Sequence, residues 1–329
     1  MFTTLPRKSR FGIRSSATSV VGRLYENALQ HNHTQKGRWP EYRPSAFPIC
    51  GILVFQQLLQ GCSTGQFTSE SDGASSLFCN MGTAAHQALQ FHMGFSRQLF
   101  GDWQCLHPIC DEHKLALEGK LTLRNTTNNF CPKCMNPMHY VEKEIRLNGL
   151  RGHIDGLIRL ADGMFWVLDF KTTTRNILGS LKTPKKNHLL QLVSYCYVLA
   201  EKYKLKIAGF SVLYLTRDNP FNYKEYSHDW SSKWHTFGKT TVETERQKYL
   251  DGLQGFVHLD TAEIIANKQC ASRAFYDKEI AYYNECPLAD VCFKRVALPD
   301  RLSDVMKMYP TNKRSRIRLA KQIYAETFN

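Results

Sequence analysis

The sequence of 329 residues lacks any apolar run close to the roughly 18 residues that a membrane-spanning helix needs, which argues against a membrane protein. Its first residues, MFTTLPRKSRFGIRSSATS, lack the apolar segment of a secretory signal, so we expect a cytoplasmic protein. An Arg- and Ser-rich start also fits a mitochondrial transit peptide, which we rank below a disordered basic arm. Internal repeats are lacking too, which excludes repeat architectures.

Acidic residues are few relative to basic ones. The sequence has 29 Asp and Glu against 43 Lys and Arg, and its net charge is +14. Such an excess favours a polyanionic partner, with DNA or RNA as the default. Charge alone leaves a merely basic protein as an equally good interpretation.

Cysteine is not scarce, but the conditions that favour disulfides are absent. Disulfides suit small secreted domains, and this chain is neither short nor visibly secreted. The 11 cysteines are odd in number and clustered in the sequence. Both features favour metal ligands in a reducing compartment.

Segment 101–139 is rich in cysteine, histidine, asparagine and threonine and has little apolar mass. Its four cysteines have the spacing of a zinc site: Cys105, Cys110, Cys131 and Cys134. We expect a zinc-ribbon insertion that folds around a structural Zn²⁺. Two alternatives stay open: His107 or His113 replaces one of the first two cysteines, or four buried thiols hold no metal.

The pattern along the chain predicts three regions: a basic flexible arm over 1–44, a core over 45–294 that carries the insertion, and a basic tail over 295–329. Apolar periodicity predicts helices over 52–59, 82–100, 188–203 and 231–253, and strands over 140–147, 152–160, 164–170 and 207–215. The Ser- and Gly-rich residues 62–80 are typical of a loop.

The strands over 152–160 and 164–170 are joined by Ala161-Asp162-Gly163, a strong hairpin signal. If these three residues form the loop, Asp155 lies opposite Asp169, and His153 lies opposite Lys171. The two aspartates and Lys171 then share one face of the sheet. A two-residue loop would shift the register and separate them.

Two carboxylates on adjacent strands repel each other unless a cation lies between them. Oxygen ligands suit Mg²⁺ or Mn²⁺. A lysine two residues beyond the second carboxylate would face the same site, where it could orient an attacking water molecule. The plain alternative is a surface hairpin with an Asp–Lys salt bridge, which the D-x-K triplet alone would favour.

Four motifs extend this match beyond a triplet: Gly82-x-x-x-His86, G-H-I-D at 152–155, V-L-D-F-K-T at 167–172, and Gln191-x-x-x-Tyr195. In this order, over about residues 45–293, they resemble the PD-(D/E)XK nuclease superfamily, and most closely its RecB-like branch, which includes Cas4 proteins and phage exonucleases. The resemblance implies an α/β fold with a mixed sheet flanked by helices.

The resemblance also implies roles for single residues. His86, Asp155 and Asp169 would bind the Mg²⁺ or Mn²⁺ ion, together with the backbone carbonyl of Phe170. Lys171 would position the attacking water.

Gln191 and Tyr195 share one helical face and would hold the DNA or the catalytic lysine. Glu142 and Glu144 precede the hairpin, and we expect at most an indirect role for them.

A second cysteine group, Cys286-Pro-Leu-Ala-Asp-Val-Cys292, resembles part of the Fe–S signature of Cas4-like nucleases. Cys50 would be the upstream ligand, but Tyr283 occupies the position of the fourth. A [4Fe–4S] cluster normally takes four thiolates. Either Cys270 completes the set through a rearranged loop, or the cluster has been lost.

The expected function is metal-dependent cleavage of DNA, as an exonuclease in replication, recombination or DNA degradation. The resemblance to phage proteins implies a phage-encoded enzyme acting in the host cytoplasm, with replication or recombination proteins as partners. The alternatives are an endonuclease or resolvase of the same fold, a catalytically inactive zinc-containing DNA-binding protein, and an enzyme acting on RNA.

Overall fold

The computed structural model describes residues 39, 41–47, 51–64, 73–111, 123–217, 222–259, 307 and 309–328. Its central sheet has four strands in the order β6 (Gly156–Arg159), β7 (Phe165–Thr173), β8 (Ile207–Thr216) and β9 (Tyr223–Asp229). β7 and β8 run parallel, while the two outer pairs are antiparallel. The predicted mixed sheet is therefore present.

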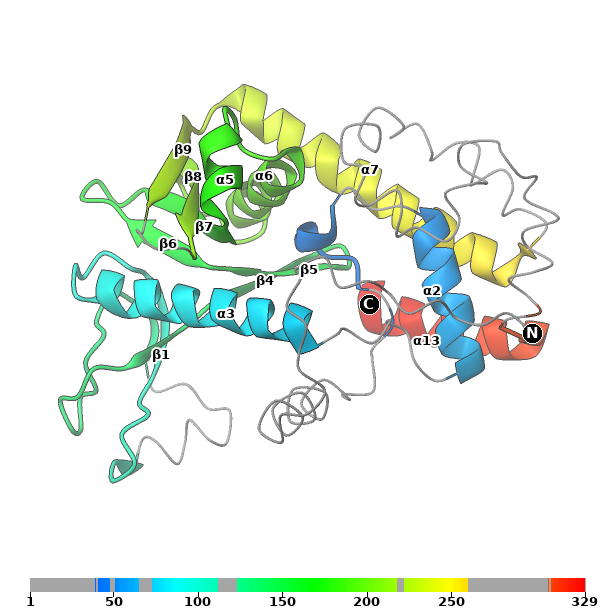
Figure 1. The fold of residues 1–329 in the computed structure, drawn as a ribbon, viewed down its shortest axis with the longest axis horizontal. Helices are drawn as coiled ribbons and strands as arrows, with labels where there is room; N and C mark the ends of the chain where they lie inside the picture. Colours follow the sequence, from blue (N-terminus) through cyan, green and yellow to red (C-terminus); the bar gives the residue numbers. More distant parts are fainter. Residues whose placement is uncertain are drawn as a thin grey trace.

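Helices cover both faces of this sheet (Figure 1). On one face, α6 (Lys186–Glu201) and the short α5 (Arg175–Ser180) contact β8, and α6 also contacts β7. On the other face, α3 (Gly73–Gly94) contacts β7. Side chains alternate along a strand, so β7 sends Val167 into the α6 layer and Leu168 toward α3.

Three further helices close the α6 side of the core. The long α7 (Ser232–Val257) contacts α6, α2 (Gly51–Thr64) and α13 (Lys313–Phe328). Ile323 of α13 is fully buried, so the C-terminal helix belongs to the core. Tyr42 is also fully buried, and its hydroxyl donates to the backbone of α7. Tyr42, which falls within the expected basic arm over 1–44, is thus a core residue, while residues 1–38 of that arm lie outside the described residues.

A separate hairpin of β4 (Lys143–Leu147) and β5 (Leu150–Ile154) precedes β6. The predicted strand over 152–160 is thus two strands, interrupted at Asp155. The register of the β6–β7 pair is the predicted one, with Gly156 opposite Leu168. The expected pairing of His153 with Lys171 is wrong, because β5 turns away to pair with β4 and His153 lies opposite Glu144.

The segment that carries the four clustered cysteines has its own sheet. Its strands are β1 (Gly101–Gln104), β2 (Leu123–Thr126) and β3 (His139–Val141), in the order β2-β1-β3. Around it lies a small core that includes Trp103 and Tyr140, whose rings meet edge to face. We call this unit the cysteine module.

Two predicted boundaries are wrong. α3 begins at Gly73, inside the loop expected over 62–80, and ends at Gly94 rather than at residue 100. Edge strand β9 was not expected, because its alternating charged and aromatic residues lack the apolar run used to find strands.

Among the described residues, no helix combines the length and the apolar content required to cross a membrane.

Candidate functional site

Asp155 and Asp169 lie next to each other where β5 passes into β6. Asp155 is one residue beyond the last β6–β7 pair, and its Oδ2 accepts a 2.7 Å hydrogen bond from the Phe170 amide. That bond fixes the carboxylate against β7. Asp155 is 8% exposed and Asp169 is fully buried, so both charges lie largely out of water.

Lys171 provides the counter-charge to Asp169. Its Nζ lies 2.9 Å from Oδ1 and 2.8 Å from Oδ2 of that carboxylate. Only the Oδ1 contact has hydrogen-bond geometry, so the buried Oδ2 has no hydrogen-bond partner. The two residues are two apart on β7, so they share one face as predicted.

Helix α3 brings His86 to the same place. A side chain at Gly82, one turn earlier, would meet the Thr172 hydroxyl at 3.3 Å, so glycine allows α3 to lie close to β7. The Nδ1 of His86 lies 3.6 Å from Asp155 Oδ2, and its ring stands edge-on to Phe170. Burial and the charge of Lys171 lower the pKa of His86 to about 4, so the imidazole is neutral and able to ligate a cation.

Glu142 is a further acidic residue of this site, although the sequence suggested only an indirect role for it. Ligand atoms of His86, Glu142 and Asp155 lie within 4.8 Å of one another. Gln90 holds two of them, since its Nε2 donates to Glu142 Oε1 at 3.2 Å and to the Asp155 carbonyl at 2.8 Å. Glu144 instead forms ion pairs with arginines outside the site.

The negative charges of the carboxylates at this site repel one another. Burial raises the pKa of Asp155 well above its usual value, and the charge of Asp169 raises it further. Burial also raises the pKa of Asp169, against the effect of Lys171. The imidazole of His86 and the carboxylates of Glu142 and Asp155 form a donor set that suits a divalent cation such as Mg²⁺ or Mn²⁺. Asp169, which is paired with Lys171, does not belong to this group of three but lies beside Asp155.

We predict that Asp155→Asn raises the melting temperature in buffer without added Mg²⁺ or Mn²⁺. A carboxyl whose pKa is raised on folding destabilises the protein at pH 7, where it is charged in the unfolded chain. Asparagine removes this charge and can still accept from the Phe170 amide. We expect a rise of about 1–2 °C, the effect of roughly 1 kcal/mol in a chain of this length.

Differential scanning calorimetry checks this prediction. Saturating Mg²⁺ should reverse the order, because only the wild-type protein then gains stability from binding the ion. A lower melting temperature for Asp155→Asn in metal-free buffer would show that the carboxylates do not repel one another.

Gln191 and Tyr195 lie in the core of the site rather than on its surface. Both are buried, and Gln191 Nε2 donates to the Tyr195 hydroxyl at 2.9 Å. The Tyr195 ring contacts Gly152 of β5 so closely that a Cβ there would lie 2.7 Å from it. The glycine of the G-H-I-D motif therefore makes room for this tyrosine.

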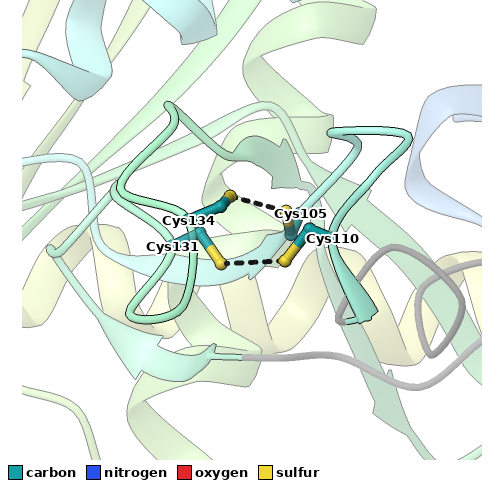
Figure 2. Close-up of side chains that lie close together, drawn as sticks. All are labelled: Cys105, Cys110, Cys131 and Cys134. Atoms are coloured by element: carbon teal, nitrogen blue, oxygen red, sulfur yellow. Dashed lines mark hydrogen bonds between the residues drawn. The ribbon is translucent and has the colours of Figure 1, made fainter.

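The structure brings the four cysteines of the cysteine module together (Figure 2). Cys105 follows β1, and its Sγ lies 3.7 Å from that of Cys134. Cys110 Sγ lies 3.8 Å from Cys131 Sγ. The turn between the last two cysteines is closed by a 2.9 Å hydrogen bond from the Met135 amide to the Cys131 carbonyl.

These distances fit a tetrahedral metal site. A disulfide would require sulfur atoms about 2.0 Å apart. Four thiolates at about 2.3 Å from a central Zn²⁺ have sulfur–sulfur edges of about 3.8 Å. Hydrogen bonds from Asn136 lower the pKa of Cys134 to about 6, which favours its thiolate form, whereas burial raises the pKa of its neighbour Cys105.

His107, the alternative zinc ligand that the structure describes, does not belong to this cluster. His107 lies in the module, but its Nδ1 is buried without a hydrogen-bond partner. His113 and the three residues expected at an Fe–S cluster, Cys50, Cys286 and Cys292, lie outside the described residues.

Comparison with known proteins gives one family. The sequence model of the PD-(D/E)XK nuclease superfamily matches residues 63–293, more than half of the chain. No curated protein matches. A solved structure titled "Crystal structure of SSO0001" is similar over 70% of this chain and 86% of that chain, with 14% sequence identity and a TM-score of 0.37.

Proposed function

Because the chain belongs to the PD-(D/E)XK nuclease superfamily, whose members use divalent metals to cleave nucleic acid, we propose that it is a Mg²⁺- or Mn²⁺-dependent deoxyribonuclease. The observation that supports the proposal is the convergence of His86, Asp155, Asp169 and Lys171 at one buried site. A surface hairpin with a simple salt bridge would not bury its carboxylates or bring a helix histidine beside them.

In this proposal, His86, Asp155 and Asp169 would hold the ion, with the carbonyl of Phe170 and with Glu142 as a further ligand. When bound, the metal would supply Lewis-acid stabilisation of the charge that develops on the phosphate. Lys171 orients the attacking water and stabilises the same charge. In-line attack breaks the bond to the 3′ oxygen and leaves a 5′-phosphate.

The other site residues act on these groups. Gln191 and Tyr195 hold the β5 side of the site in place, since Tyr195 contacts Gly152 three residues before Asp155. Gln90 holds the side chain of Glu142 in place through the hydrogen bond from its Nε2 to Oε1.

We further propose that Cys105, Cys110, Cys131 and Cys134 bind a structural Zn²⁺ and that the basic tails and this zinc module follow the DNA backbone without reading its sequence. An exonuclease of the RecB and Cas4-like branch, phage-encoded and acting with replication or recombination proteins in the cytoplasm, is the most specific form of the proposal. A [4Fe–4S] cluster at Cys50, Cys286 and Cys292 is part of it only if a fourth ligand exists.

Incubation with DNA tests the proposal directly. The substrates are end-labelled linear DNA, single- and double-stranded, a covalently closed circle and RNA of the same sequence, each with Mg²⁺ or Mn²⁺. An exonuclease should shorten linear DNA and spare the circle. Opening of the circle would indicate the endonuclease alternative, and binding without cleavage of any substrate would indicate an inactive DNA-binding protein.

We predict that Glu142→Gln raises the Mg²⁺ concentration needed for half-maximal cleavage by about 10–100-fold, the usual cost of losing a group that tunes a metal site. The amide oxygen can still accept from Gln90, so the change removes mainly charge. Glu144→Gln is the matched control, because Glu144 pairs with Arg146 and Arg151 instead. Equal metal dependence of both variants would remove Glu142 from the ligand set.

A further inference from the structure

His188 lies on the face of α6 that carries Gln191 and Tyr195, but it belongs to none of the motifs. It precedes these two residues by three and seven positions, so all three project to the same side of the helix. Its Nδ1 lies 2.7 Å from the hydroxyl of Tyr214 on β8. His188 is therefore fixed over the sheet one turn closer to the start of α6 than Gln191.

Tyr214 connects His188 to the catalytic lysine. Lys171 and Tyr214 are direct partners in the parallel β7–β8 pair, so their side chains project from the same face. Burial, followed by the charges of Lys171 and Lys185, lowers the pKa of His188 to about 3. The ring is therefore neutral at physiological pH and has one N–H.

The Tyr214 hydroxyl decides which ring nitrogen carries that hydrogen. Its oxygen accepts a 2.9 Å hydrogen bond from the Lys185 amide, and it has a single proton to donate. Among the described residues, the Nδ1 of His188 is the acceptor within reach. The hydroxyl thus donates to Nδ1, which leaves the hydrogen on Nε2, a nitrogen that makes no hydrogen bond within the described part of the chain.

We propose that His188 is a phosphate-binding residue of the active site, whose Nε2–H donates to an oxygen of the DNA phosphate beside Lys171. The proposal rests on the deoxyribonuclease function proposed above and names a contact for its substrate. A neutral donor suits this place, because a second cation next to Lys171 would be repelled by it.

Two substitutions separate this role from a structural one. His188→Gln can place an amide N–H near the position of Nε2, whereas His188→Asn can accept from Tyr214 in place of Nδ1 but does not reach as far. DNA affinity is measured by fluorescence anisotropy with Ca²⁺ in place of Mg²⁺, and cleavage is measured in single-turnover reactions. Melting temperatures report the fold of each variant.

We expect His188→Asn to weaken DNA binding about tenfold or more, the effect of one lost hydrogen bond to a charged group. His188→Gln should recover affinity to within about threefold of wild type, because it restores that bond. Tyr214→Phe should weaken binding less than His188→Asn and add little to it in the double variant, since both act through one nitrogen.

Wild-type DNA affinity in His188→Asn would overturn the proposal. Equal losses of DNA affinity in His188→Asn and His188→Gln, in proportion to the fall in their melting temperatures, would overturn it too. A wild-type protein that binds DNA but cleaves none would overturn the proposed function alone, and the anisotropy comparison would still decide the role of His188. A wild-type protein that does neither would overturn both.

Discussion

Substitution of Lys171 by alanine is expected to lower the rate constant of DNA cleavage by about 10²–10³-fold, the usual cost of losing a group that stabilises transition-state charge. The Nζ atom contacts the buried carboxylate of Asp169, while 21% of the lysine side chain remains exposed. It can therefore reach both the metal ligands and an incoming phosphate. Single-turnover cleavage at saturating Mg²⁺ measures the effect.

DNA affinity should fall by about tenfold at most, because one positive charge is lost from a chain whose net charge is +14. Lys206→Ala is the matched control: Lys206 is exposed directly before β8, roughly 26 Å along the extended chain from Tyr214, the partner of Lys171. Cleavage that survives in Lys171→Ala at the rate of this control would contradict the proposed mechanism.

The local part of the site could be predicted from the sequence. The loop at residues 161–163 fixes the register of the β6–β7 pair, and the register brings Asp155 beside Asp169. The alternation of side chains then places Lys171 on the face of Asp169. These relations extend over fewer than 20 residues and depend only on turn geometry and strand periodicity.

The long-range part could not be predicted. Glu142 lies next to His86 because β4 and β5 form their own hairpin, a pairing that the two predicted strands did not specify. Gln90 follows His86 by four residues, a spacing that places it on the same helical face, but its two acceptors come from other segments. Tyr42 likewise enters the core through a contact 200 residues away in the sequence.

Replacement of Cys110 and Cys131 by serine is expected to remove bound zinc, lower the melting temperature and reduce cleavage. The cysteine module has a small core of its own, so without a metal little else holds its sheet together. Its strand β3 ends at Val141, directly before Glu142. Loss of the module should therefore also displace Glu142, a proposed ligand of the catalytic cation.

Elemental analysis of the purified wild-type protein should give one zinc per chain from the cysteine module and none in the double variant. Cleavage by the double variant is then measured as a function of added Mg²⁺. Displacement of Glu142 should raise the Mg²⁺ concentration needed for half-maximal cleavage by about 10–100-fold. Cys62→Ser is the matched control, since Cys62 lies on α2, outside the module. Full activity in a zinc-free double variant would separate the module from catalysis, because the position of Glu142 would then be set by Gln90 and the β4–β5 hairpin alone.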